Sequence, residues 1–274
     1  MEFSKREPSR WIFSRELRDS TQTEGSETDE RMRPYIVTPL GTRLKRIFFC
    51  GTITTSSIEE NSSRLVIADP VGSFYVSASS AGFNEPVRDE MSKFNTGDRI
   101  AVMGKVSIFK AETGNFLFTI NPERIWSADD ALRNFWNART LIIARRRVLA
   151  IKEAQKLEKP SEMMLIRLGY SPEEAHFALL AVNRYKDYDY SRFIESATTS
   201  VRKDQSDEIN RAKKSILEII DRHSDDQKGV SYETILGDAA AEGIDKKIID
   251  DSLNALGNDG EVYEVSLKRF KRVS

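Results

Sequence analysis

Five short runs of β-branched and aromatic residues, separated by polar turns, dominate the first half of the 274-residue chain. The runs are 46–54, 64–70, 72–79, 97–111 and 116–126, and a helix-like stretch, 84–94, separates the third from the fourth. Five strands with one helix in that place follow the order of an OB barrel. We therefore predict an α+β multidomain protein with a five-stranded OB barrel over 34–127. An SH3-like barrel or a plain β-meander is the alternative fold for this region.

The third run shows which side chains should face the barrel core. A strand places successive side chains on opposite faces of its sheet. This rule directs Phe74, Val76 and Ala78 inward, and it directs the residues between them outward, Tyr75 included. Gly104 in the fourth run fits the bulge or bend that a small closed barrel needs.

The sequence lacks several motifs, and their absence argues against whole classes of function. No stretch reaches about 18 consecutive apolar residues, so we expect no membrane span. The sequence lacks a GxxxxGK[ST] phosphate loop, a GxSxG elbow and an HExxH zinc motif. With one cysteine and two histidines it offers neither a disulfide framework nor a CxxC zinc site. We therefore expect a binding protein rather than an enzyme, without cofactor or metal, and interpret Cys50 as a small core residue.

The first 33 residues are polar and interrupted, which is typical of a flexible arm. Within them lies an island, REPSRWIFSREL, at residues 6–17. Its Trp11, Ile12 and Phe13 are too apolar for an ordinary tail. We predict that this island is a short docking motif that packs either on the chain's own barrel or on a partner.

A long helix for assembly is predicted over 128–160, because apolar residues recur at helical spacing and Pro160 follows. The segment holds eight basic and four acidic residues, a net charge of +4. Its arginines at 145–147 could lie along a phosphate backbone, but we favour packing on the barrel or on partner subunits through the apolar stripe. The candidate partner-binding residues are Leu132, Phe135, Trp136, Ile142 and Ile143.

Two further modules complete the chain. Residues 161–206 are predicted to form a small helical module and a linker, with Ser171 and Glu174 in a capping box. Residues 207–274 follow the order helix, strand, two helices and two-stranded wing, which is typical of a winged-helix domain. This domain holds eleven basic and fifteen acidic residues, a net charge of −4. That charge favours docking of a protein over binding of duplex DNA.

An OB barrel has one recurring ligand surface, formed by the outer face of its second and third strands and two adjoining loops. Single-stranded nucleic acid binds there by stacking bases on aromatic rings and pairing phosphates with basic side chains. The candidate nucleic-acid-binding residues are Tyr75, Phe109, Lys110, Arg46, Arg64, Arg99 and Lys105. Residues 41–127 hold ten basic and nine acidic residues, so we expect weak binding by the barrel alone.

Several motifs resemble the archaeal replication protein A-associated protein family. They are REPSRWIFSREL, YIVTPLGTRLKRIFFCGTIT, SSRLVIADPVGSFYVSAS, GKVSIF and INPERIW, all within residues 6–126. The segment 207–274 is similar to the winged helix of the middle subunit of replication protein A. The resemblance implies a cytoplasmic, nucleoid-associated protein of an archaeal cell. It further implies an OB barrel that binds single-stranded DNA together with a replication protein A partner in DNA replication or repair.

The resemblance also implies that Tyr75 and Ser79 lie on the binding face, with Phe109 at the hairpin. Ser79 occupies a position where a stacking aromatic is often found. Two functions therefore stay open. One is a single-stranded DNA-binding accessory subunit of a replication protein A-type complex. The other is an assembly scaffold with little DNA affinity, which recruits subunits through its helix and a replication or repair protein through its winged helix.

Overall fold

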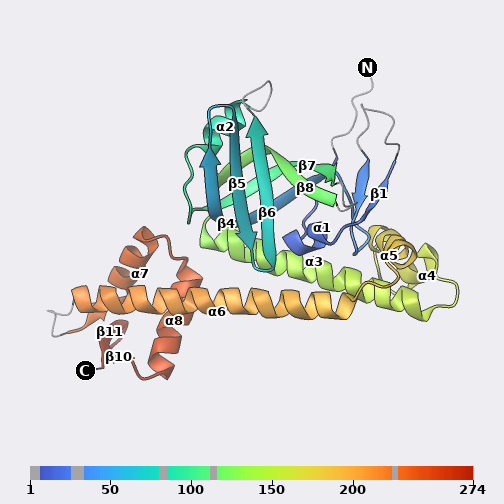
Figure 1. Ribbon diagram of the computed structural model, residues 1–274. Coiled ribbons are helices and arrows are strands. Elements are labelled where there is room, and N and C mark those ends of the chain that lie inside the picture. Colours follow the sequence, from blue (N-terminus) through green and yellow to red (C-terminus); the bar gives the residue numbers. More distant parts are fainter. Residues whose placement is uncertain (1–6, 26–33, 80–84, 112–115, 224–227, 274) are drawn as a thin grey trace, which may run out of the picture. The chain divides into compact units, whose positions relative to one another are not determined.

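The computed structural model describes residues 7–25, 34–79, 85–111, 116–223 and 228–273 (Figure 1). The chain divides into two compact units. The barrel unit comprises residues 1–128 and 135–201, and the C-terminal unit comprises 129–134 and 202–274. Each unit has a hydrophobic core of its own.

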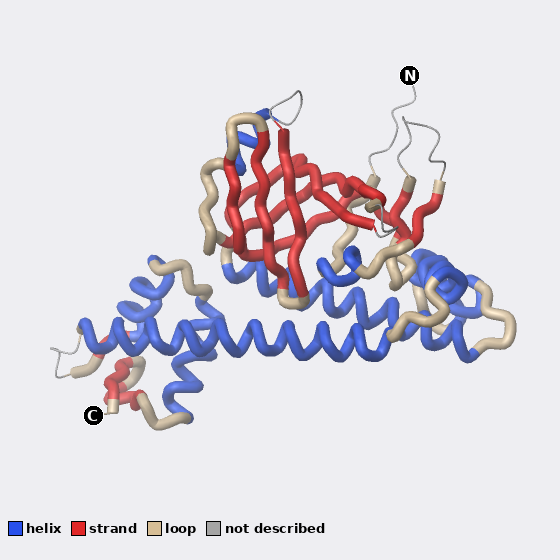
Figure 2. Tube along the Cα trace, viewed as in Figure 1, coloured by secondary structure: helices blue, strands red, loops and turns tan. Residues whose placement is uncertain are grey.

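Five strands close into a barrel in the barrel unit (Figure 2). They are β4 (Arg46–Ile58), β5 (Ser62–Asp69), β6 (Gly72–Ser79), β7 (Arg99–Lys110) and β8 (Phe116–Ser127). Their order around the barrel is β4-β5-β6-β8-β7, in which the β6–β8 pair is parallel and the other pairs are antiparallel. Helix α2 (Glu85–Met91) connects β6 to β7. This topology is an OB fold, as predicted.

The side-chain alternation predicted for β6 is confirmed. Phe74 and Val76 are buried, whereas Tyr75 between them is exposed on the outer face. The ring of Phe74 packs against that of Phe49 in β4, with ring centroids 4.0 Å apart. Contacts of this kind across the barrel interior fix which face of each strand remains available to a ligand.

Gly104 and Cys50 also take the places predicted for them. The pairing of β7 with β8 shifts register between Met103 and Gly104. A Cβ atom at Gly104 would lie 2.5 Å from the carbonyl oxygen of Asn121, so the close approach of β8 requires glycine here. Cys50 is buried in β4.

The N-terminal island docks on the chain's own barrel. The Arg10 amide donates to the carbonyl of Arg46 at 2.9 Å, and the Phe48 amide donates to the carbonyl of Arg10 at 3.0 Å. Ile12 and Phe13 are fully buried. The next elements are α1 (Ser14–Arg18) and a small sheet of β1 (Gln22–Glu24), β2 (Tyr35–Val37) and β3 (Arg43–Leu44). A flexible arm is therefore wrong for residues 7–25, while residues 1–6 and 26–33 lie outside the described residues.

Four helices follow the barrel: α3 (Asp130–Lys156), α4 (Glu162–Arg167), α5 (Pro172–Arg184) and α6 (Tyr190–Arg222). The carboxylate of Asp129 accepts a hydrogen bond from the Leu132 amide at 2.7 Å and caps α3. The capping box predicted from Ser171 and Glu174 is present at α5. The linker expected before residue 207 is instead part of α6, whose 33 residues include neither glycine nor proline.

The helical module packs closely on the segments around the barrel. The Tyr185 hydroxyl donates to the carbonyl of Val37 at 2.5 Å. Gly41 has a φ of 74°, and a Cβ atom there would lie 1.8 Å from the carbonyl oxygen of Phe177 in α5. No other residue fits this contact, so the module and the barrel form one continuous body.

The C-terminal unit contains the elements expected for residues 207–274. After α6 come β9 (Val230–Ser231), α7 (Tyr232–Ala241), α8 (Lys246–Asn258), β10 (Val262–Ser266) and β11 (Arg269–Arg272), with the strands in the order β10-β11-β9. Its core includes Ile249 and Leu256. The first turn of α3 is tied to α6 within this unit, because buried Arg133 pairs with Asp204 and with Glu208.

Candidate nucleic-acid interface

A groove of about 780 Å³ lies on the barrel over the outer face of β5 and β6 and the hairpin of β7 and β8. Its lining residues are Ser14, Leu17, Arg18, Thr55, Ser57, Arg64, Leu65, Val66, Ser73, Phe74, Tyr75, Val76, Ser77, Phe109, Phe116, Leu117, Phe118, Thr119, Ile120 and Asn121. Three of the seven predicted nucleic-acid contacts are among them: Tyr75, Phe109 and Arg64. The structure thus brings together residues that lie up to 45 positions apart in the chain.

Two aromatic rings are exposed to solvent in the groove. Tyr75 has 60 % of its surface exposed and Phe109 has 58 %. Tyr75 points outward because its neighbours in β6 fill the core, and Phe109 lies one residue before the end of β7. Across the hairpin, Phe116 and Phe118 pack edge to face with centroids 6.2 Å apart. Exposed rings in a groove are the geometry on which unstacked bases can stack.

Two arginines supply the positive charge of the groove. Arg64 is exposed on β5, directly opposite Ser77 of β6. Arg18 reaches the groove from α1, and its Nε lies 3.5 Å from a carboxylate oxygen of Asp19. Among the described residues, those that line the groove include no aspartate and no glutamate. A phosphate entering the groove therefore meets Arg64, whereas Arg18 already has the carboxylate of Asp19 beside it.

Arg46 and Lys105, two other predicted contacts, lie elsewhere on the barrel. Arg46 is 9 % exposed, and its Nε donates to Oε2 of Glu123 at 2.8 Å while its Nη1 donates to the carbonyl of Glu7 at 3.0 Å. Lys105, opposite Arg46 in the sheet, has its Nζ 3.8 Å from Oε1 of the same Glu123. The assignment of Arg46 as a phosphate contact is therefore wrong, because its guanidinium is held inside the protein by its own partners.

The last two predicted cations also lie outside the groove lining. Arg99 is the first residue of β7, at the opposite end of the strand from the hairpin. Lys110 ends β7 next to Phe109 and is exposed, but adjacent strand residues point to opposite faces. Of the predicted basic contacts, Arg64 alone lines the groove.

Seventeen of the twenty groove residues lie outside the predicted set, among them Phe116, Leu117, Phe118 and Arg18. The three apolar residues follow the hairpin turn consecutively, which breaks the alternation expected of a strand with one buried face. That break was a usable sign that both faces of β8 carry apolar contacts here. Arg18 gave no such sign, because it reaches the groove through the docking of the N-terminal island.

The predicted partner-binding residues divide between the core and the surface. Trp136 is fully buried; its Nε1 donates to the carbonyl of Phe48 at 3.1 Å, and its ring packs edge to face on Phe13 with centroids 5.5 Å apart. The prediction that Trp136 binds a partner is therefore wrong. Leu132 and Ile143 are half-buried, and Leu132 belongs to the C-terminal unit.

Phe135 and Ile142 remain as surface candidates, and Leu149 joins them. Phe135 has 59 % of its surface exposed, and Ile142 and Leu149 are about half exposed. These three residues stand seven positions apart on α3 and share one face of the helix. We call them the α3 seam. Trp11 of the N-terminal island lies beside the seam, with its ring centroid 6.0 Å from that of Phe135.

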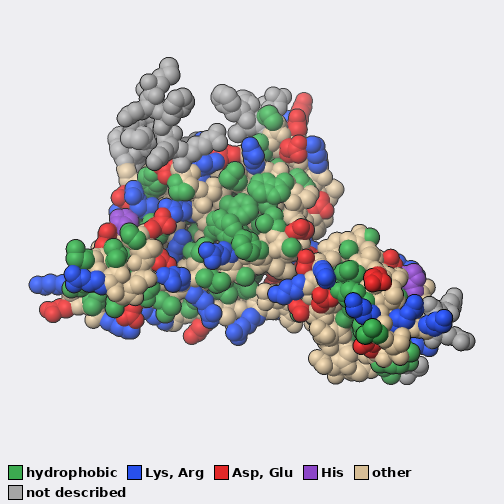
Figure 3. Space-filling model, turned by 180° about the vertical axis from the view of Figure 1, so that it is seen from behind, with side chains coloured by type: hydrophobic (Ala, Val, Ile, Leu, Met, Phe, Trp, Pro, Cys, Tyr) green, Lys and Arg blue, Asp and Glu red, His purple; other side chains and the backbone are tan. Residues whose placement is uncertain are grey.

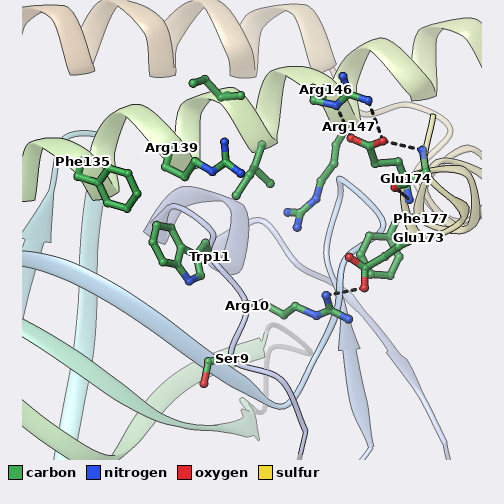
Figure 4. A pocket seen from close by; sticks show the side chains of 13 residues that line it. Ser9, Arg10, Trp11, Phe135, Arg139, Arg146, Arg147, Glu173, Glu174 and Phe177 are labelled. Atoms are coloured by element: carbon green, nitrogen blue, oxygen red, sulfur yellow. Dashed lines mark hydrogen bonds and ion pairs between the residues drawn. The ribbon is translucent and has the colours of Figure 1, made fainter. Parts of the chain in front are cut away.

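A pocket of about 400 Å³ opens between α3, the N-terminal island and the start of α5 (Figure 4). Phe135, Ile142, Trp11 and Phe177 supply apolar walls. Several arginines surround it and two of them are paired with acidic residues of α5. Arg10 lies 2.6 Å from Glu173, and Arg146 donates to both carboxylate oxygens of Glu174 at 2.5 and 3.0 Å.

Burial and pairing shift the pKa values of the charged groups around this pocket. The Arg146 guanidinium lowers the pKa of Glu174 to about 2. Arg147 is 8 % exposed, and its Nη1 lies 3.6 Å from Oε1 of buried Glu16. Burial lowers the pKa of Arg147 and raises the pKa of Glu16. The Arg147 Nη1 has no hydrogen-bond acceptor among the described residues.

Within the described parts of the chain, no helix is long and apolar enough to cross a membrane. The same residues contain no group of three or more His, Cys, Asp or Glu side chains placed to hold a metal ion.

Comparison with known proteins finds only low similarity to solved structures. No protein-family model and no curated protein matches the chain. A chain in the structure of a replication protein A heterotrimer bound to ssDNA is 11 % identical, with 52 % of this chain and 98 % of that chain covered and a TM-score of 0.37. For the S. pombe Stn1-ten1 complex the identity is 16 %, the coverage 45 % and 82 %, and the TM-score 0.34. Similarities at this level assign neither a role nor a ligand to this chain.

Proposed function

We propose that the chain binds single-stranded DNA in the barrel groove, as an accessory subunit of a replication protein A-type complex. The observation that supports this most is the exposure of Tyr75 and Phe109 in one groove, whose described lining residues include arginine and no carboxylate. Bases of a single strand can leave their own stack and lie on these rings, whereas paired bases of a duplex cannot. The role we propose is binding in DNA replication or repair inside an archaeal cell, not catalysis.

The charge of the groove predicts modest affinity. Each phosphate neutralised on a single strand contributes about −0.7 to the slope of log K against log salt concentration. With Arg18 and Arg64 as the lining cations, we expect a slope of about −1.4. Weak binding of this kind suits a subunit that acts beside other DNA-binding subunits.

A titration of fluorescent oligo(dT) with the full chain tests this proposal. Tyr75→Ala with Phe109→Ala should weaken binding by about 2–6 kcal/mol at most, since each stacked base contributes about 1–3 kcal/mol. The matched control is Tyr263→Ala with Phe135→Ala, which also removes one exposed tyrosine and one exposed phenylalanine, but away from the groove. Equal affinity of the groove variant and the wild-type chain would reject the groove, and degradation of the oligo(dT) would reject a role limited to binding.

The exposed α3 seam supports a second function, assembly with a replication protein A subunit. Phe135, Ile142 and Leu149 form an apolar row that the barrel unit itself does not cover. Such a row on a helix is suited to packing against another helix. Phe135→Glu with Ile142→Glu should abolish co-purification with the partner subunit while leaving the fold intact. Retention of the partner would reject assembly through α3.

We also propose that the C-terminal unit is a winged helix that docks a replication or repair protein. Its β10–β11 hairpin exposes apolar side chains, above all Leu267. Two of the hairpin's basic residues are already engaged: Arg269 donates to the Gly229 carbonyl at 2.7 Å, and Arg272 pairs with Asp221. Micromolar duplex binding by the full chain at physiological salt, lost when Lys268 and Lys271 become Ala, would contradict protein docking.

A further inference from the structure

The α3 seam runs directly into the arginine-rich pocket beside it. Steps of seven residues along a helix cover about 10.5 Å each, so Phe135, Ile142 and Leu149 span about 21 Å. Phe135 and Ile142 also line the pocket, where Trp11 and Phe177 extend the apolar wall away from α3. A seam of this length beside a side-chain-sized pocket matches the way an amphipathic helix docks in a groove.

The charge that α3 itself carries along the seam is of one sign. Residues 135–149 contain four arginines and no acidic residue. Arg146 is tied to Glu174, and Arg147 lies close to buried Glu16. Arg139 and Arg145 are exposed, and no described residue supplies either of them with a carboxylate. Figure 3 shows hydrophobic side chains gathered on a face of the barrel unit with Lys and Arg side chains at their edge.

This charge disfavours a second copy of the chain as the occupant. Two α3 helices packed seam to seam would bring arginine toward arginine in either the parallel or the antiparallel orientation. Like charges facing each other across an interface are repulsive. A helix with glutamate or aspartate beside its apolar row would instead neutralise Arg139 and Arg145.

Arg147 provides a second, independent reason for an acidic occupant. Its side chain is more than nine-tenths buried, and its Nη1 lacks a hydrogen-bond acceptor among the described residues. Figure 4 shows the guanidinium extending from α3 toward the space between Trp11 and Phe177. Arg147 lines the pocket, so its positive charge favours a carboxylate on the helix that docks there.

We propose that the pocket and the α3 seam bind an amphipathic helix of a partner protein, whose apolar row is flanked by acidic side chains. This proposal rests on the assembly role of α3 and adds the chemistry of the partner. It also excludes the association of two copies of the chain through this face.

Two synthetic helical peptides of about three heptads test the proposal. Both carry the same leucine row; one has glutamate and the other lysine at the flanking positions. Fluorescence anisotropy with the full chain should show that the glutamate peptide binds at least about tenfold more tightly. Arg139→Glu with Arg145→Glu should reverse this preference. Equal binding of the two peptides, no binding of the glutamate peptide, or an unchanged preference in the variant would each overturn the proposal.

A variant without the α3 seam shows whether a negative result rejects the acidic partner or the assembly role of α3. Phe135→Ser, Ile142→Ser and Leu149→Ser together should abolish binding of both peptides. If the seam is required but the charge of the peptide is not, the assembly surface stands and the acidic partner is wrong. If the seam variant binds as tightly as the wild-type chain, the assembly surface itself is wrong.

Sedimentation provides a readout that needs no peptide. The wild-type chain should remain monomeric, as should the variant Arg139→Glu with Arg145→Glu. A mixture of the two should associate, because the variant presents the same seam with acidic flanks. Dimerisation of the wild-type chain that the seam variant abolishes would overturn the exclusion of self-pairing.

Discussion

The barrel groove and the pocket beside α3 both combine aromatic rings with arginines, but they differ in how those arginines are neutralised. The described residues that line the groove include no carboxylate, whereas Glu173 and Glu174 line the pocket and pair with Arg10 and Arg146. A DNA strand carries one negative charge per nucleotide and would meet two carboxylates in the pocket. A protein helix can place one carboxylate at a chosen position. The distribution of acids, more than the number of arginines, therefore separates a nucleic-acid face from a protein face.

The largest change in the free energy of unfolding is expected for a substitution of Trp136, which precedes the pocket residues Arg139 and Ile142 on α3. Trp136→Ala should lower the free energy of unfolding of the barrel unit by about 3–5 kcal/mol, because it removes a fully buried ring and leaves a cavity. Phe135→Ala, one residue earlier, should change it by less than about 0.5 kcal/mol, because that ring is exposed. Chemical denaturation measures both. Similar losses in the two variants would mean that the boundary between core and seam is misplaced.

Arg46 and Arg64 provide the next comparison, between a buried cation and a groove cation. Arg46→Ala leaves Glu123 without its main partner and should cost about 1–3 kcal/mol of stability with unchanged DNA affinity. Arg64→Ala should leave stability within about 0.5 kcal/mol. It should also reduce the magnitude of the salt slope of oligo(dT) binding by about 0.7. Denaturation and salt titrations of both variants check this, and a reduced slope in the Arg46 variant would contradict the assignment.

The smallest effect concerns the pH dependence of the contact between α5 and α3. The pKa of Glu174 is lowered to about 2 from an ordinary value of 4.5, so its ionised form is favoured in the folded protein. Its contribution to stability is present above about pH 4.5 and is lost as the pH falls through about 2. Glu174→Gln should therefore lose less stability than the wild-type chain over this range in denaturation measurements. Parallel losses would show that the ion pair with Arg146 does not contribute.

The barrel could be predicted from the sequence because the alternation within each strand and the order of the strands can be recognised in short segments. Alternation in β6 assigned Phe74 to the core and Tyr75 to the surface, and both assignments are confirmed. The order of five runs and one helix was enough for the OB topology. The uninterrupted α6 was also within reach of the sequence, since a stretch without glycine or proline gave no reason to place a linker there.

The distinction between site and core residues was harder, because it depends on contacts between distant segments. Arg46 and Arg64 look alike in the sequence, but Glu123, which holds Arg46, lies 77 positions away. Phe135 and Trp136 are adjacent on α3, and only the angle at which the helix packs on Phe13 and Phe48 decides which one is buried. The seven-residue spacing does not separate the two either, because Phe135, Ile142 and Leu149 follow it and so do Trp136, Ile143 and Ala150.

Photocrosslinking to an oligo(dT) that contains 5-iododeoxyuridine tests the assignment of the two faces directly. Mass spectrometry of the crosslinked full chain should locate the attachment at Tyr75, Phe109 and the neighbouring Phe116, which line the groove. Crosslinks concentrated at Trp11 and Phe135 would contradict the account, because they would place the DNA on the face that we assign to a partner helix.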